Sequence, residues 1–224
     1  MSWMVRSFVL PLLLLRLWGL QEGAHACSCV ARHPQQVFCQ ADVVIKATVV
    51  GKTDVSLKQS VANPGLFNPG VIDPIKYDLK QTKMFKGPKK LFGAIYTGLN
   101  SAACGVNLAN GIEYILMGRL HSDGSLHISS CDLYQSWDDL SATQKNLLKH
   151  YEMGCDCKIL RCTSLPCGIS NPTECLWTDL LPVKMASGEQ AQNYACIKRR
   201  YGYCTWFRVG PLPTKGFLGG IKGR

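Results

Sequence analysis

The sequence predicts a mainly β protein with short helices, in which a small closed barrel of five strands, of the OB type, precedes a smaller disulfide-rich β domain. Three observations support this fold class. Five segments between residues 41 and 131 have strand patterns, and an amphipathic helix follows them. Seven of the 12 cysteines fall within residues 155–204, where no long periodic element occurs. After residue 26, no apolar run is long enough to span a bilayer.

Residues 1–26 have the three parts of a secretory signal peptide. A cationic start precedes an apolar run over residues 8–17, and Ala24-His25-Ala26 has the small-x-small pattern of a cleavage site. The alternative is a membrane anchor, which needs about 20 uninterrupted apolar residues, and Arg16 interrupts this run. We therefore expect cleavage before Cys27 and a secreted, extracellular protein.

All 12 cysteines lie in the expected mature chain, from Cys27 onward. A disulfide framework in an oxidising compartment requires such an even number, so six bridges are expected, and spacing alone leaves their pairing open. A change of texture at Cys155-Asp156-Cys157 divides the cysteines six and six. We predict a first domain over residues 27–156 and a second over residues 157–224.

The first domain begins with a short predicted helix over residues 34–39, where Pro34 suits the first helical position. Residues 41–50 are rich in β-branched side chains and predict a strand. Residues 51–74 lose this period and contain two Asn-Pro-Gly turn signals. We expect a long exposed loop there, either functional or a tolerated insertion.

Four more strands are predicted after this loop. From residue 75 apolar and polar side chains alternate, and the phase slips near Gln81, which indicates a bulge. Asp123-Gly124, the preferred pair of a type I′ hairpin, joins the last two strands. After the strand that begins at residue 75, the other three predicted strands cover residues 94–99, 113–122 and 125–131.

A capping box at Ser141-Ala142-Thr143-Gln144 starts a predicted amphipathic helix that ends at Gly154. In the second domain we expect Trp177 and Trp206 to supply core area that short strands cannot provide. From Arg208 onward the chain is rich in Gly and Pro and has no acidic residue, which predicts a basic tail.

Positive charge is concentrated in the second domain. Residues 27–156 hold 13 Lys and Arg against 11 Asp and Glu, whereas residues 157–224 hold 10 against 3. In a secreted protein this favours heparan sulfate or other matrix polyanions as further partners; no nucleic-acid-binding motif is present. A cluster of lysines could form such a site, with a solvated strand end as the alternative: Lys83, Lys86, Lys89 and Lys90.

No catalytic constellation is evident in the sequence. No HExxH motif occurs, and an even number of cysteines leaves none over as a nucleophile. Cys27/Cys29 and Cys155/Cys157 could indicate a zinc or redox site, but paired cysteines in an exported chain favour disulfides. We predict that the chain is no enzyme and has no cofactor of its own. The four histidines of the mature chain are dispersed: His33, His121, His127 and His150.

Several motifs together resemble the tissue inhibitors of metalloproteinases, over a match that extends from Cys27 to about Arg208 and includes all 12 cysteines in order. The resemblance implies a netrin-like OB-fold barrel, a smaller C-terminal domain and 1:1 inhibition of secreted zinc metalloendopeptidases, the matrix metalloproteinases. The motifs are CSC at Cys27, HPQQVFC, ADVVIKA, KMFKG, CGV at Cys104, WDDLSATQK, YEMGCDCKI, ECLWTD and YACIKRRYGYCTWFR.

The resemblance also implies a disulfide pairing, three bridges to each domain. In the first domain the implied pairs are Cys27–Cys104, Cys29–Cys131 and Cys39–Cys155. In the second domain they are Cys157–Cys204, Cys162–Cys167 and Cys175–Cys196.

The resemblance further implies that the α-amine and the carbonyl oxygen of Cys27 chelate the catalytic zinc of the target protease, an ion shared only in the complex. Ser28 would then enter the specificity pocket beside this zinc. The implied protease-binding residues are Cys27, Ser28, Cys29, Val30, Ser101, Ala102, Ala103 and Cys104. The alternative is a non-inhibitory netrin-like module that binds extracellular matrix, heparin or a receptor.

Two features depart from the family pattern. Lys46 stands where the family usually has Arg, a minor change if the side chain is solvated. The tail over residues 211–224 is basic, whereas some members of the family have an acidic tail that docks on a proenzyme. We therefore do not extend proenzyme binding to this chain.

Overall fold

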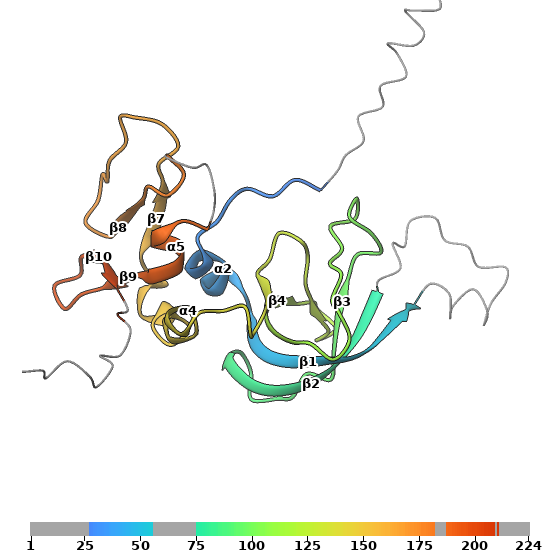
Figure 1. Cartoon of the computed structure of the whole chain (residues 1–224). Helices are drawn as coiled ribbons and strands as arrows, with labels where there is room; N and C mark the ends of the chain where they lie inside the picture. The colour runs from blue at the N-terminus through green and yellow to red at the C-terminus, as the bar shows by residue number, and fades with distance from the viewer. Residues whose placement is uncertain (1–26, 56–74, 182–186, 209, 211–224) are drawn as a thin grey trace, which may run out of the picture.

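The computed structural model describes residues 27–55, 75–181, 187–208 and 210 (Figure 1). The predicted leader, residues 56–74 of the predicted loop and the tail over residues 211–224 lie outside this part of the chain. None of the helices in the described part is long and apolar enough to cross a membrane.

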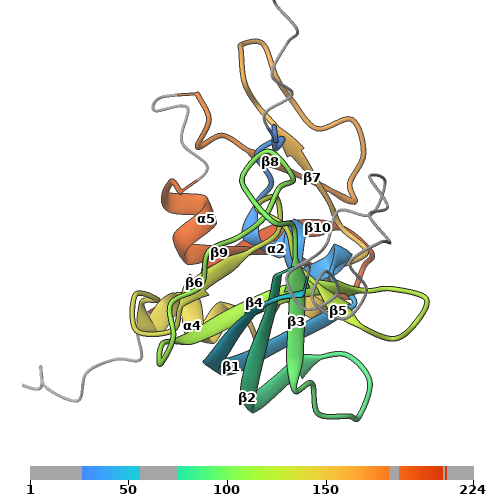
Figure 2. The ribbon, with the colours of Figure 1, turned by 90° about the vertical axis from the view of Figure 1, so that its right-hand side faces the viewer.

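Five strands form a closed barrel. The sheet order is β1-β2-β3-β5-β4, and β1 pairs with β4 as well as with β2, which closes the ring. All pairings in the ring are antiparallel except β3 with β5, and Figure 2 shows β1, β2 and β3 side by side. The strands are β1 (Val43–Asp54), β2 (Ile75–Lys86), β3 (Ala94–Thr97), β4 (Glu113–Leu120) and β5 (Leu126–His127).

The first strand has one face in the barrel and the other under helices. Ile45, Ala47 and Val49 alternate into the barrel and are fully buried there. Val44 on the opposite face is also fully buried, because it packs in a second cluster with residues of α2 (Pro34–Gln40) and α4 (Ala142–Leu147). Burial on both faces explains why residues 41–50 are almost continuously apolar.

Two predictions about the first hairpin have different outcomes. The pairing jumps from Lys46 opposite Lys83 to Ala47 opposite Gln81, so the predicted bulge is confirmed. The predicted loop over residues 51–74 began too early, because residues 51–54 continue β1 and pair with the start of β2. Residues 51–54 have a turn-like composition, but hydrogen bonding to β2 keeps them in a strand.

The turn between β4 and β5 is not of the predicted type I′. Gly124 has φ 78°, but Asp123 is absent from the described residues with positive φ, which type I′ requires at both positions. Instead, Gly124 N donates to His121 O at 2.9 Å and His121 N donates to Ser125 O at 3.0 Å. The loop therefore has three residues, and β5 keeps only Leu126–His127 of the predicted strand 125–131.

The later helix is confirmed at its start and is shorter than predicted at its end. Ser141 and Gln144 form the predicted capping box of α4, but the chain then tightens into the 3₁₀ helix η1 (Tyr151–Gly154). Leu147 and Tyr151 still share one buried face. No sequence pattern predicted β6 (Tyr134–Ser136), a short strand that pairs with β4 outside the barrel ring.

The described part of the second half, residues 157–181, 187–208 and 210, contains two small two-stranded sheets. β7 (Lys158–Arg161) pairs in parallel with β8 (Glu174–Trp177), and β9 (Tyr194–Lys198), which follows α5 (Glu189–Asn193), pairs antiparallel with β10 (Cys204–Arg208). Trp177 is fully buried at the centre of a cluster with disulfide sulfurs, and Trp206 packs against it. Both predicted core roles are confirmed.

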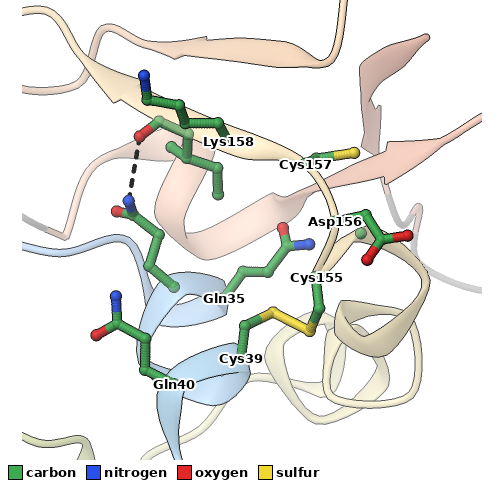
Figure 3. A pocket seen from close by; sticks show the side chains of 10 residues that line it. Gln35, Cys39, Gln40, Cys155, Asp156, Cys157 and Lys158 are labelled. Carbon is green, nitrogen blue, oxygen red and sulfur yellow. Dashed lines mark hydrogen bonds between the residues drawn. A yellow bond between two sulfur atoms is a disulfide. The ribbon is translucent and has the colours of Figure 1, made fainter. Parts of the chain in front are cut away.

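Helix α2 joins the barrel to the second half (Figure 1). Buried Gln35 donates to Tyr151 O and Cys196 O and accepts from Cys196 N. Figure 3 shows the Cys39–Cys155 disulfide next to Gln35, beside a cavity of about 390 Å³. The boundary at residues 156 and 157 stays a proposal, because the cluster that contains α2 also includes residues of β9.

Candidate functional site

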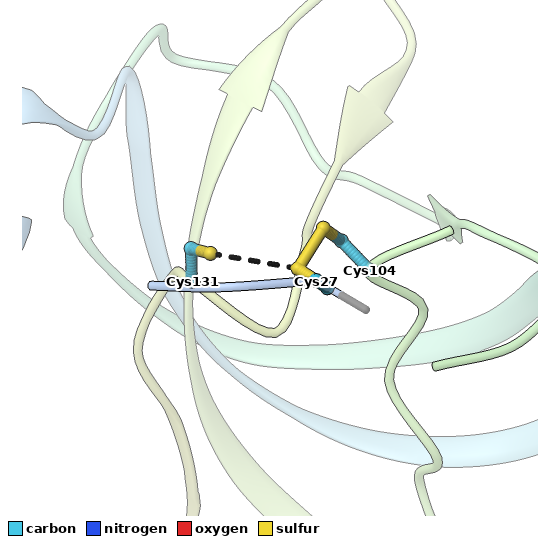
Figure 4. A group of neighbouring side chains, drawn as sticks. All are labelled: Cys27, Cys104 and Cys131. Atoms are coloured by element: carbon cyan, nitrogen blue, oxygen red, sulfur yellow. Dashed lines mark hydrogen bonds between the residues drawn. A yellow bond between two sulfur atoms is a disulfide. The ribbon is translucent and has the colours of Figure 1, made fainter. Parts of the chain in front are cut away.

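Two disulfides fix the segment 27–30 to the rim of the barrel. Cys27 is bonded to Cys104 and Cys29 to Cys131, and Figure 4 shows the first bridge next to the Cys131 side chain. Together, residues 27–30 and 101–104 form what we call the N-terminal edge. It contains all eight residues for which the resemblance implies protease binding.

The second arm of this edge is a tight turn. Ala103 N donates to Asn100 O, Cys104 N to Ser101 O and Gly105 N to Asn100 O. Cys104 has φ 55°, a left-handed conformation that is uncommon outside glycine. Gly98 lies so close to Ala103 O that a Cβ at this position would collide with it. The turn therefore folds back onto the end of β3.

The first arm is exposed and unpaired. Ser28, Cys29 and Val30 are exposed, Val30 to 63%, and Cys27 is half-buried. Among the described residues, no hydrogen bond between backbone groups involves residues 28–30. An extended segment with free N–H and C=O groups can add to a partner as an extra strand.

Arg32 anchors the end of the exposed segment. Its guanidinium donates to Gln40 Oε1 at 2.6 Å and to the carbonyl oxygen of Cys131, and it lies 3.6 Å from Asp132. No sequence pattern predicted this role. The signal was weak, since an arginine three residues after Cys29 has no partner in the sequence until the fold brings residues 131 and 132 beside it.

His33 is where the segment enters the core. The side chain is fully buried; Nδ1 accepts from Gln35 N and caps α2, and Nε2 lies 3.2 Å from Gln190 O. Its ring packs against Trp177 and Trp206. Burial lowers the pKa of His33 from 6.5 to about 4. In the sequence this histidine is only one of four dispersed ones, so its role in the core was not predicted.

Several sulfur atoms lie close together without forming a metal site. Cys27 Sγ and Cys131 Sγ are 3.8 Å apart (Figure 4), and a second group contains Cys157, Cys196 and Cys204. Every sulfur in both groups belongs to a disulfide, and the described residues include no free cysteine. Disulfide sulfurs offer no thiolate to a metal ion. Each of the two sulfur groups therefore consists of neighbouring disulfide bridges and not of metal ligands.

Two histidines that are separate in the sequence meet at the β4–β5 hairpin. The centroids of the His121 and His127 rings are 3.6 Å apart and the rings stack, which their dispersion in the sequence does not reveal. His127 Nε2 is 2.7 Å from Ser125 Oγ, which lies 2.6 Å from Asp123 Oδ1. This order is wrong for a hydrolase, because serine stands between histidine and aspartate and directs its proton to the carboxylate.

Lysines that were candidates for polyanion binding are partly engaged. Lys86 Nζ donates to Phe38 O and Cys39 O, and Lys90 Nζ donates to Gly124 O. Lys46, whose replacement of Arg would be minor if the side chain were solvated, is only 20% exposed and pairs with Glu113 at 2.9 Å. Of the candidate cluster, Lys83, Lys89 and Lys90 are exposed, and Lys86 is half-buried.

Comparison with known proteins identifies the family. A family model described as tissue inhibitor of metalloproteinase matches residues 25–206. The chain belongs to this family. Metalloproteinase inhibitor 2 of Cavia porcellus is 49% identical over 216 residues, which cover 95% of this chain and 96% of that protein. The Homo sapiens protein of the same name is 48% identical over the same shares. The Gallus gallus protein is 45% identical over 94% of each chain.

Membership in the tissue inhibitor family makes this chain an inhibitor and not an enzyme, in agreement with the order of the Asp123, Ser125 and His127 side chains. The disulfide pairs of the structure are those that the resemblance implies. The eight residues of the N-terminal edge therefore lie together on one rim of a barrel that belongs to an inhibitor family.

Proposed function

We propose that the mature protein is secreted and inhibits zinc metalloendopeptidases, the matrix metalloproteinases, by laying its N-terminal edge in their active-site cleft. The observation that carries the proposal is the exposed Ser28 between two cysteines that are each bonded to the barrel. Cleavage before Cys27 then leaves a free α-amine at the tip of a rigid segment.

The α-amine suits a catalytic zinc, which three protein ligands hold with an open position for water. Its pKa is about 7.7–8.0, so deprotonating it at pH 7 costs roughly 1 kcal/mol, whereas a lysine would cost about 4.6 kcal/mol. The amine and the carbonyl oxygen of Cys27 would replace the water as a chelating pair. The zinc belongs to the protease, so the inhibitor needs no metal of its own.

The disulfides make the segment ready to bind. Ordering one residue costs about 1–2 kcal/mol, and the bridges from Cys27 and Cys29 remove most of this cost before binding. Ser28 is left as the small side chain that enters the specificity pocket. Val30 and the turn over residues 101–103 extend the surface along the cleft, where the unpaired backbone adds to the protease as a strand.

An added residue before Cys27 tests the mechanism. An amide nitrogen has no available lone pair for zinc, so mature protein with one extra Ala before Cys27 should lose tight inhibition, by at least about 1,000-fold or 4 kcal/mol. The inhibition constant against a matrix metalloproteinase measures this, with near-UV circular dichroism as the check on folding. Equal potency of the two proteins would refute zinc chelation.

A second function, retention on matrix polyanions such as heparan sulfate, is favoured by the exposed basic tip of the β9–β10 hairpin. Arg199 and Arg200 are exposed there, next to Tyr201, which is 91% exposed. Elution of the full chain from heparin at rising salt tests this. Replacing both arginines with Gln should lower the salt needed, and no change would exclude this tip.

A further inference from the structure

A charged cavity of about 370 Å³ lies next to the N-terminal edge. Its lining includes Gly98, which lies against Ala103, and Cys131, which is bonded to Cys29. The proposed zinc chelation uses none of the charged side chains in this cavity. They are Arg32, Arg119, His121, His127 and Asp132.

Strand register places two of the cavity-lining side chains, Arg119 and His127, on one outer face. His127 lies opposite Arg119 on β4 and beside Tyr96 on β3, while the neighbouring Leu126 points into the barrel core. The His127 ring stacks on that of Tyr96, with the centroids 5.3 Å apart, and on that of His121, with the centroids 3.6 Å apart. The outer face therefore presents three stacked rings next to an arginine.

The hydrogen bonds of the hairpin fix the proton of His127. Asp123 Oδ1 accepts from Ser125 N at 2.8 Å and from Ser125 Oγ at 2.6 Å. The single hydroxyl proton of Ser125 is used there, so His127 Nε2, 2.7 Å from this oxygen, must donate to it. Nδ1 is consequently the nitrogen that takes up a second proton when the ring becomes cationic.

The charges around the cavity leave one strong cation without a partner. Arg32 is occupied by Gln40, Cys131 O and Asp132, and Asp132 Oδ2 accepts from Ser129 N and Oγ. The side chain of Arg119 is exposed and forms no hydrogen bond or ion pair within the described part of the chain. With both histidines neutral, two arginines and one aspartate give the lining a net charge of one positive unit.

Protonation of both His121 and His127 would place two positive charges on stacked rings, which is unfavourable. Burial, and then the nearby charge of His121, lower the pKa of His127, and Asp123 opposes this only in part. Two further charged groups contact the hairpin: the Lys90 ammonium donates to Gly124 O, and Asp42 Oδ2 accepts from Leu120 N at 2.9 Å. An anion held between the rings and Arg119 would offset the repulsion between two imidazolium groups.

We propose that this cavity binds a small oxyanion between Arg119 and the two imidazoles, and binds it more tightly at acidic pH. Charge-assisted hydrogen bonds from an arginine and an imidazolium are the usual ligands of carboxylate and sulfate groups. Linkage makes the effect reciprocal, so a bound anion also raises the proton affinity of the pair. The site is independent of the proposed zinc chelation, because none of the three residues belongs to the N-terminal edge.

Titration of the full mature protein with sodium sulfate, at constant ionic strength set with sodium chloride, tests the site. The imidazole ¹H–¹³C signals are followed at pH 5.5 and pH 7.5, either side of the ordinary histidine pKa of about 6.5. We expect saturable shifts at His121 and His127, with at least about tenfold tighter binding at the lower pH. Sodium acetate serves as the carboxylate probe, and saturation by either anion supports the site.

Variants separate a site from general charge attraction. Arg119→Gln should weaken binding by about tenfold, and His121→Gln should reduce the pH dependence, because only one of the two imidazoles remains. Lys149→Gln removes an equal charge from an exposed residue after α4 and should change neither. Arg119 is exposed, so its variant is expected to fold even if the His121 variant does not. Non-saturating shifts with both anions, or equal effects of the Arg119 and Lys149 variants, would overturn the proposal.

Discussion

Cys27 and Cys29 are bridged to two points on the same barrel, whereas Cys155 and Cys157 are bridged to opposite halves of the molecule. The first pair reaches Cys104 and Cys131 and leaves Ser28 exposed between its cysteines. The second pair reaches Cys39 on α2 and Cys204 on β10. Identical Cys-x-Cys spacing therefore fixes an exposed segment in one place and joins two halves in the other.

The location of the partner cysteines, and not the spacing, decides what such a pair does. Both bridges of the first pair close long segments, with sequence separations of 77 and 102 residues. Their entropic effect on the unfolded chain is similar to that of the Cys39–Cys155 bridge, which has a separation of 116 residues. Removing a bridge of either pair should lower the stability of the fold. Only removal of a bridge from the first pair should weaken inhibition at a temperature where the protein stays folded.

Removing one bridge from each pair gives the largest expected effects. Cys29→Ser with Cys131→Ser should weaken inhibition by about 100-fold, because two residues that regain freedom cost about 3 kcal/mol on binding. Cys39→Ser with Cys155→Ser should lower the free energy of unfolding by about 2–5 kcal/mol and leave the inhibition constant unchanged. Inhibition constants and urea unfolding at 25 °C measure both. Similar losses of inhibition in the two variants would show that the pairs are not specialised.

Acid should lower the free energy of unfolding through His33, the N-cap residue of α2, which joins the barrel to the second half. Its pKa of about 4 lies below the ordinary 6.5, so the unfolded chain takes up a proton that the folded chain excludes. Stability should be complete above about pH 6.5 and should fall by about 3 kcal/mol as the pH approaches 4. Urea unfolding from pH 7.5 to 4 measures the slope.

His33→Asn is the matched control for this acid effect. Asparagine is a good N-cap residue and can accept from Gln35 N, but it does not titrate. The variant should have a flatter dependence of unfolding free energy on pH, by the share that His33 contributes. Parallel curves for the two proteins would assign the acid sensitivity to other groups.

Alanine substitutions at two glycines near β3, Gly98 and Gly93, test whether the N-terminal edge responds differently from its surroundings. Gly98→Ala would force a Cβ against Ala103 O, so we expect a loss of about 1–3 kcal/mol in stability together with weaker inhibition. A Cβ added at Gly93 would meet no atom within 4 Å, and Gly93→Ala should leave inhibition unchanged. Thermal unfolding and inhibition constants are compared for the pair. Unchanged inhibition in the Gly98 variant would show that the turn over residues 101–104 is not part of the binding surface.

Ser28→Arg should give the smallest and most selective effect. A longer side chain fits a deep specificity pocket better than a shallow one, so the ratio of inhibition constants between such proteases should change by about tenfold. Ser164→Arg, at an exposed position outside the N-terminal edge, is the control for added charge. A uniform change across proteases would place Ser28 outside the pocket.

Residue type and periodicity predicted most of the barrel, because the β-branched content of β1 and the alternation in β2 are local signals, as is the capping box of α4. What they missed depends on contacts between distant residues. The strand β6 is specified by its pairing with β4, and the extension of β1 by its pairing with β2. The end of α4 is set by tertiary packing where the chain meets α2 and β9.

The N-terminal edge could be proposed from the sequence through the family resemblance, since spacing alone left the disulfide partners open. The supporting residues could not. Arg32 reaches Cys131 and Asp132 only when the barrel closes. His121 and His127 stack because a three-residue turn sets their register, and the sequence pointed to a two-residue turn there.

The most direct test of zinc chelation is a crystal structure of the mature protein bound to the zinc-loaded catalytic domain of a matrix metalloproteinase. We predict that the nitrogen and the carbonyl oxygen of Cys27 both lie within about 2.0–2.3 Å of the zinc in place of its water. Ser28 should then point into the pocket beside the metal. A complex in which the zinc keeps its water and Cys27 lies away from it would contradict the proposed mechanism.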